Sequence, residues 1–102
     1  MATEFNSYRI YYQSAPQYNW QSRIYLYKNG AYVGLIMFMK NDVSLPANKV
    51  VNDKHIVHFP NSEFSNIMEI LRQEKPLYIH VVDSNGIGTI STSSEPVGEE
   101  ES

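Results

Sequence analysis

The sequence predicts an α+β domain with a mainly antiparallel, twisted sheet and one amphipathic helix packed on one face, in the order β-β-β-β-α-β-β. Two hairpin turns and one helical periodicity support this prediction. Two stretches rich in Tyr, Ile and Val turn back at Asn29-Gly30 and Asn85-Gly86, and Asn-Gly tolerates the positive φ angles of a two-residue hairpin turn. Between the hairpins, apolar residues after Pro60 recur at helical spacing.

The chain has the size and composition of one folded domain. Its 102 residues are 42% hydrophobic and 13% aromatic, whereas disordered chains are poor in both classes. The absence of cysteine excludes disulfides, thiolate metal sites and thiol nucleophiles. No basic leader precedes an apolar run, and no apolar stretch is long enough to span a bilayer, so we expect a cytoplasmic protein without membrane contact.

The first predicted strand covers residues 5–13 and alternates between two faces. One face takes Tyr8, Ile10 and Tyr12, and the other takes Arg9 and Tyr11. A loop that contains Pro16 separates this strand from the first hairpin.

The first hairpin joins residues 20–28 and 31–40 through Asn29-Gly30. Pairing outward from this turn sets Tyr25 opposite Gly34, where its ring can cover the bare glycine backbone. The same register sends one set of side chains to the core, namely Trp20, Ile24, Leu26, Val33, Leu35, Met37 and Met39. It sends a second set to the opposite face, namely Gln21, Arg23, Tyr25, Tyr27, Tyr32, Ile36, Phe38 and Lys40.

Residues 41–53 show no sustained apolar period and are expected to form a long loop, after which residues 54–59 return as a strand. In the helix that follows, Asn61 or Ser62 can supply the N-cap. Its apolar positions are Phe64, Ile67, Met68 and Leu71.

Lys75-Pro76 ends the helix, and residues 77–83 and 87–92 form the second hairpin. In this order all adjacent strands can be hairpin neighbours.

Charge is distributed unevenly along the chain. The formal net charge is −3, although the segment from Phe5 to Pro60 carries six basic residues and two acidic ones. Residues 93–102 hold four glutamates and no base. We therefore expect one domain over residues 1–92 and an acidic, disordered tail over 93–102. The tail either solubilises the protein or mimics a polyanion that folds back on the basic half.

The outer face of the first hairpin carries more aromatic rings and cations than a solvated sheet face needs. Three interpretations are open. Another part of the chain or a second copy covers the face, or the rings stack bases of single-stranded nucleic acid while cations meet phosphates, or the face binds a protein. The candidate binding residues are Arg9, Arg23, Tyr25, Tyr27, Tyr32, Phe38 and Lys40.

Catalytic and metal chemistry find no support in the sequence. His55 and His58 lie three residues apart in a strand and point to opposite faces, and His80 is expected on a surface face. Gly86 and Gly88 lie in a hairpin turn and not between a strand and a helix, which excludes a phosphate loop. We expect a non-enzymatic binding domain without metal or cofactor.

The passage HIVHFPNSEFSNIMEILRQ, after a twisted hairpin, resembles the single-stranded DNA-binding domains of the positive-cofactor-4 type of transcription coactivator and the related plant Whirly proteins. The similarity covers residues 20–75. It implies four antiparallel strands before a helix, a transcription regulator-like homodimer or higher oligomer, and a sheet that holds unpaired bases. The matching positions are Arg23, Tyr25, Tyr27, Tyr32, Phe38 and Lys40.

Nearly the whole chain, including RIYLYKNGAYVGLIMF, LRQEKPLYI and STSSEPVGEEE, also resembles a group of short, uncharacterised bacterial proteins. This resemblance implies a bacterial source. The sequence as a whole favours a domain that binds single-stranded nucleic acid. The alternative is a protein-interaction or homo-oligomerisation module that uses the same face.

Overall fold

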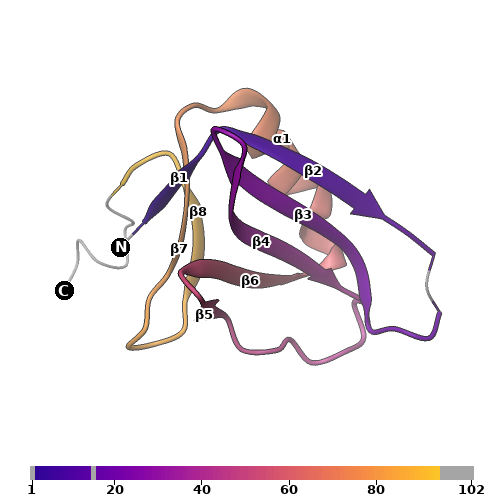
Figure 1. Cartoon of the computed structure of the whole chain (residues 1–102). Helices are drawn as coiled ribbons and strands as arrows, with labels where there is room; N and C mark the ends of the chain where they lie inside the picture. The colour runs from indigo at the N-terminus through magenta and orange to yellow at the C-terminus, as the bar shows by residue number, and fades with distance from the viewer. Residues whose placement is uncertain (1, 15, 95–102) are drawn as a thin grey trace.

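The computed structural model describes residues 2–14 and 16–94 and confirms the predicted fold class, with two mostly antiparallel sheets and one helical segment (Figure 1). The larger sheet has the order β2-β3-β4-β6-β5, with β2 at Ser7–Tyr12, β3 at Trp20–Lys28, β4 at Ala31–Met39, β6 at Lys54–Pro60 and β5 at Lys49–Val51. The smaller sheet has the order β1-β7-β8, with β1 at Thr3–Phe5, β7 at Leu77–Val81 and β8 at Gly88–Ser91. Most of the predicted acidic tail, residues 95–102, lies outside the described residues.

The helical segment begins after Pro60 with a 3-10 turn, Asn61–Glu63, and continues as α1, Phe64–Gln73. Ile67, Met68 and Leu71 are buried, as their spacing predicts. The predicted caps lie inside the 3-10 turn, and neither N-cap position makes a side-chain capping hydrogen bond. Instead, the Ser62 N–H donates to Oδ1 of Asn41 at 2.9 Å, so the loop after β4 supplies an acceptor to this helix end. Within the described ranges, no helix is both long and apolar enough to cross a membrane.

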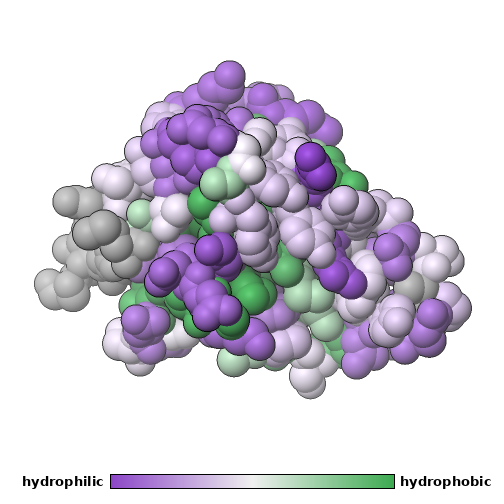
Figure 2. Space-filling model, in the orientation of Figure 1, coloured by the Kyte–Doolittle hydropathy of each residue, from purple (hydrophilic) through white to green (hydrophobic). Residues whose placement is uncertain are grey.

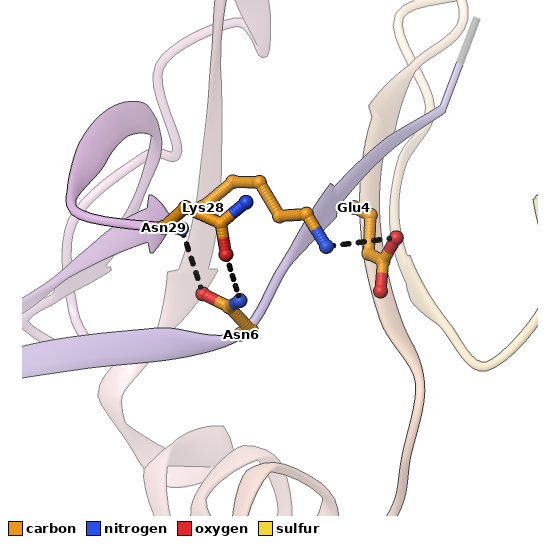
Figure 3. Close-up of polar contacts among 4 residues, drawn as sticks. All are labelled: Glu4, Asn6, Lys28 and Asn29. Atoms are coloured by element: carbon orange, nitrogen blue, oxygen red, sulfur yellow. Dashed lines mark hydrogen bonds and ion pairs between the residues drawn. The ribbon is translucent and has the colours of Figure 1, made fainter.

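The first predicted strand is in fact two strands that bend apart at Asn6. β1 pairs with β7 in the smaller sheet, whereas β2 pairs with β3 in the larger one. At the bend, Oδ1 of Asn6 accepts the Asn29 N–H at 3.0 Å, and Nδ2 of Asn6 donates to Oδ1 of Asn29 at 2.8 Å (Figure 3). An ion pair of 3.2 Å between Glu4 and Lys28 lies beside them. The bend is thereby attached to the hairpin turn, and β2 extends the larger sheet and does not cover it.

The pairing of β4 with β6 differs from the predicted hairpin order. β4 and β6 run parallel, from Gly34 opposite His55 to Met39 opposite Pro60. The expected long loop also contains β5, which pairs antiparallel with the far side of β6. A parallel pair needs a crossover connection, which residues 40–53 provide, so the prediction that adjacent strands are all hairpin neighbours is wrong here. It also departs from the four antiparallel strands that the first resemblance implies.

A β-bulge in the first hairpin changes the predicted faces. Tyr27 pairs with Tyr32 as expected, but the register then shifts by one residue and Leu26 lies opposite Gly34. A shift of one residue moves every later side chain to the other face. The expected cover of Gly34 by the Tyr25 ring is therefore wrong, since Tyr25 lies opposite Leu35. The shift moves Ile36 and Phe38 into the core and Leu35, Met37 and Met39 to the opposite face.

The core lies between the larger sheet on one side and α1 with the smaller sheet on the other (Figure 1). Its fully buried side chains include Phe5, Ile24, Leu26, Ile36, Phe38, Val57 and Ile79. Two glycines set the approach of the sheets. A Cβ on Gly34 would lie 3.3 Å from the Ile79 side chain, and one on Gly88 would lie 2.7 Å from the Val57 side chain.

His80 is buried, with 3% of its surface exposed, so its predicted place on a surface face is wrong. Alternation along β7 does place it away from Ile79, but the small sheet packs beside β6. The rings of His80 and His55 are therefore only 5.8 Å apart. The packing of the smaller sheet beside β6 therefore buries His80, although Tyr78 of the same strand stays half-buried.

Candidate aromatic binding face

The surface of β2, β3 and β4 that faces away from α1 carries the rings and cations of the candidate site (Figure 1). We call it the tyrosine face, and its residues are Arg9, Tyr11, Trp20, Arg23, Tyr25, Tyr27 and Tyr32. Figure 2 looks onto this side of the molecule and shows pale and green surface in the centre, bordered by hydrophilic surface. This side of the molecule is thus weakly polar in its centre and hydrophilic at its margins.

Cross-strand pairing brings these residues together. Arg9 lies directly opposite Tyr25 in the β2–β3 ladder, and Tyr11 lies opposite Arg23. Side chains directly opposite each other share a face of the sheet and are close enough to interact. The alternation of β2 and β3 therefore places each cation of one strand beside a ring of the next.

The tyrosine rings contact one another. The ring centroids of Tyr25 and Tyr32 are 5.9 Å apart, and those of Tyr27 and Tyr32 are 6.2 Å apart. Tyr11 meets Tyr25 edge to face at 5.3 Å and 82°. Such tilted and edge-to-face pairs are favourable arrangements of aromatic quadrupoles. Each ring therefore restricts the motion of its neighbours.

Two guanidinium groups lie over rings of this face. The Arg23 guanidinium carbon is 3.8 Å from the centroid of the Trp20 ring, and the Arg9 carbon is 5.4 Å from that of Tyr27. Both distances are within the range of a cation–π interaction. Arg23 also donates from Nη1 to the Tyr25 hydroxyl at 3.1 Å, while its buried Nε has no hydrogen-bond partner within the part of the chain that the structure describes. The face is held together by rings and cations in contact.

The side chains enclose a shallow cavity of about 220 Å³, lined by Tyr11, Gln13, Trp20, Arg23, Tyr25 and Tyr27. This volume is below the roughly 300–1,000 Å³ of pockets that enclose drug-sized ligands. The cavity therefore suits one planar group better than a large buried ligand. At its margin, the Tyr18 ring stacks on that of Trp20 at 5.8 Å, and the Tyr18 side chain is half exposed.

Burial raises the pKa of the Tyr32 hydroxyl above its ordinary value, and the neighbouring hydroxyls of Tyr25 and Tyr27 raise it further. The hydroxyl therefore stays protonated well above neutral pH and remains able to donate a hydrogen bond.

Five of the predicted binding residues meet on this face, namely Arg9, Arg23, Tyr25, Tyr27 and Tyr32. Phe38 does not, because the bulge turns it into the core with 0% of its surface exposed. Lys40 follows β4, and its ammonium donates to the Pro16 carbonyl at 3.4 Å, so it lies beside the loop between β2 and β3.

Sequence reasoning missed two residues of the face. Trp20 was assigned to the core, but a second register shift between Trp20 and Ser22 puts it beside Arg23. Tyr11 was placed on the same side of its strand as Arg9 and was not chosen as a binding residue. The alternation that it shares with Arg9 could have identified it.

The two histidines of β6 lie on opposite faces, as predicted, because His55 pairs with Gly34 and His58 with Met37 of β4. His55 accepts the Val81 N–H at Nδ1 over 3.2 Å, so its neutral ring carries the proton on Nε2, which lies 3.1 Å from the Thr3 hydroxyl. Burial lowers the pKa of His55 and of His58. Among residues 2–14 and 16–94, no three His, Cys, Asp or Glu side chains gather to hold a metal ion.

The tyrosine face thus offers half-exposed rings, cations and a shallow hollow, which are the means of noncovalent recognition. Comparison of the chain with protein-family models, curated proteins and solved structures found no match.

Proposed function

We propose that the tyrosine face binds single-stranded nucleic acid, with bases stacked on its rings and phosphates next to its guanidinium groups. The observation that carries the proposal is the contact of rings and cations in one layer, with Arg23 over Trp20 and Arg9 over Tyr27. Surfaces that bind single strands combine stacking rings with positive charge along the backbone path.

The held geometry of the rings favours this use. Tyr25, Tyr27 and Tyr32 lie at intermediate exposure and contact one another, so a ligand would not need to order them. Ordering of side chains on binding costs free energy, and a preorganised surface avoids part of that cost.

The charge of the surrounding chain supports the same ligand. The segment from Phe5 to Pro60 holds four more basic residues than acidic ones, from six Lys or Arg and two Asp. The three strands that carry the tyrosine face, β2, β3 and β4, lie within this segment. A local excess of positive charge attracts a polyanion even in a protein whose net charge is −3. We further propose that the protein is located in the cytoplasm, where single-stranded nucleic acid is available.

A single strand is favoured over a duplex. Bases in a duplex are already stacked on each other, and only an unpaired base can lie on a protein ring. The sheet of this protein presents its rings on a broad surface and not on a helix that could enter a groove.

The test is fluorescence anisotropy of a labelled, mixed-sequence strand of roughly 20 nucleotides, at about 50 and 200 mM salt, with the matching duplex as control. We expect the single strand to bind more tightly than the duplex and to weaken as salt rises, because phosphate contacts release counterions. Absence of single-strand binding at the lower salt concentration would refute the proposal and favour the alternative, a protein-interaction surface.

A further inference from the structure

β2 is an edge strand with one open side. Among residues 2–14 and 16–94, its one neighbour in the larger sheet is β3. Its apolar and aromatic side chains are well exposed, with 43% of Ile10, 47% of Tyr11 and 59% of Tyr12 accessible. An exposed edge of this kind is a template for pairing with a further strand unless charge or proline prevents it.

The hydrogen bonds to β3 determine which backbone groups face the open side. The Gln13 N–H donates to the Gln21 carbonyl at 3.3 Å, so these two residues form a hydrogen-bonded pair. Hydrogen-bonded pairs alternate along an antiparallel ladder, which assigns Tyr11 and Arg9 to bonds with β3. The backbone N–H and C=O groups of Tyr8, Ile10 and Tyr12 consequently point to the open side.

These three residues are self-complementary. When β2 pairs antiparallel with β2 of a second copy, a register centred on Ile10 sets Ile10 opposite Ile10 of that copy. Tyr8 and Tyr12 then lie opposite each other at both ends. Every outward backbone group within β2 finds a partner, and the paired side chains are apolar or aromatic. On the tyrosine face, Arg9 lies opposite Tyr11 of the second copy, where a cation–π contact can form.

The two neighbouring registers of this β2–β2 pair are less favourable. A register centred on Arg9 sets two arginines directly opposite each other, and like charges in that position destabilise a sheet. A register centred on Tyr11 leaves the backbone groups of Tyr8 opposite Ser14, which lies beyond the end of β2. The charge of Arg9 and the length of the strand therefore both favour the register centred on Ile10.

The face toward α1 has room for the incoming strand. Tyr8 and Leu71, together with Phe5 and Pro76, contribute to a cavity of about 570 Å³ between the start of β2 and the end of α1. In the register centred on Ile10, the ring of Tyr12 from the second copy comes next to Tyr8, at this cavity. The exposed Tyr12 ring would then be covered.

We infer that β2 pairs antiparallel with β2 of a second copy of this chain, centred on Ile10, and joins the two larger sheets into one. The two-fold axis of such a pair is perpendicular to the sheet, because facing residues share a side. The two tyrosine faces therefore become one continuous surface. This inference goes beyond the proposed function and does not depend on it.

Single cysteines in this cysteine-free chain test the register. Ile10→Cys brings two cysteines to a Cα separation of about 5.5 Å, which a disulfide can span. Arg9→Cys and Tyr11→Cys each place their own copies about 8 Å apart, which is too far. A mixture of Arg9→Cys and Tyr11→Cys proteins, however, brings unlike cysteines to about 4.5 Å.

Under mild oxidation we expect Ile10→Cys to form dimers at least about tenfold faster than Arg9→Cys or Tyr11→Cys alone, and the mixture to form a cross-linked dimer. Equal rates for all three variants, with no gain in the mixture, would overturn the inference.

Sedimentation of proteins without cysteine tests the pairing itself. Ile10→Pro removes an N–H that β3 does not use, and edge strands tolerate proline at such positions. We expect the unmodified chain and Ile10→Thr to sediment as dimers and Ile10→Pro as a folded monomer. A monomeric unmodified chain at its highest soluble concentration would refute the inference. Anisotropy with the Ile10→Pro monomer separates the two proposals, because its tyrosine face is intact.

Discussion

Asn6, at the bend between β1 and β2, forms hydrogen bonds with both the backbone and the side chain of Asn29, in the turn between β3 and β4. Asn29 has a positive φ of 51°, a conformation that asparagine tolerates better than most residues. The two hydrogen bonds therefore stabilise a turn whose backbone is under mild strain, and they align β2 with β3.

Asn6→Ala should lower the free energy of unfolding by about 1 kcal/mol, because two exposed hydrogen bonds are lost. Urea denaturation measures this effect. Glu4→Gln, which breaks only the adjacent surface ion pair with Lys28, is the control and should cost less than about 0.5 kcal/mol. Equal effects of the two substitutions would contradict a special role for Asn6.

Gly34→Ala should destabilise the protein by about 1–3 kcal/mol through overpacking. The new Cβ would lie 2.9 Å from the His55 carbonyl oxygen, a backbone atom that cannot move freely. Val33→Ala, at the preceding half-buried residue, removes side-chain volume and adds no close contact. Thermal unfolding of both variants makes the comparison. An unchanged melting temperature for Gly34→Ala would mean that β4 and β6 can move apart at this point without cost.

Arg23→Ala should reduce the salt dependence of single-strand binding, with the logarithmic slope falling by about 0.7 for one lost phosphate contact. Arg72→Ala is the matched control, since Arg72 is an exposed arginine of α1 on the opposite side of the sheet. Anisotropy titrations over a salt series measure both slopes. If the two variants had the same slope, Arg23 would not be a phosphate contact.

Tyr27→Leu should weaken single-strand binding by about 1–3 kcal/mol and leave the salt slope unchanged, because a stacked base is lost and no phosphate contact is removed. Tyr78→Leu serves as control, since Tyr78 is a half-buried tyrosine of the smaller sheet. The same titrations give both affinities. A loss of similar size in the control would point to a general effect on folding.

Stability should fall as pH decreases below the ordinary histidine pKa of 6.5. Burial lowers the folded-state pKa of His55, with a further contribution from His80 that Asp83 partly offsets, and burial with nearby Lys49 lowers that of His58. Between the folded and unfolded pKa values only the unfolded chain binds these protons, so acid favours unfolding.

The urea midpoint at about pH 5.5 should therefore be lower than at about pH 7.5. His55→Gln should reduce the difference between the two midpoints, although it also loses stability at the higher pH. If the difference between the two midpoints were as large in His55→Gln as in the unmodified protein, groups other than His55 would cause the pH dependence.

The positions of most elements could be predicted because their signals are local. Asn29-Gly30 identified the first hairpin, and the spacing of Ile67, Met68 and Leu71 identified the helix. The register of β4 could not be predicted, since residues 33–39 are apolar on both faces and alternation does not distinguish them. The bulge allows Gly34 to lie against Ile79, which is a contact between distant segments.

In the candidate site too, local alternation predicted the face of some residues, while register shifts changed the face of others. Tyr25, Tyr27 and Arg23 belong to the part of β3 after the shift at Trp20, where alternation was interpreted correctly, and they lie where the sequence predicts. Phe38 lies beyond the bulge and Trp20 beyond the second shift, so both were assigned to the wrong face. The parallel pairing of β4 with β6 and the burial of His80 depend on how the two sheets pack, for which a single sequence contains no local signal.

The pairing of β1 with β7 also has a consequence for the order of folding. During synthesis, the β3–β4 hairpin can form as soon as its own residues emerge, but β1 waits for a partner that is made much later. Until α1 and β7 are made, the core around Ile24 and Leu26 lacks Met68, Leu71 and Ile79. Contacts between distant residues form slowly because a long loop must close first. The rate of folding should therefore be governed by closure of the smaller sheet and not by the hairpin.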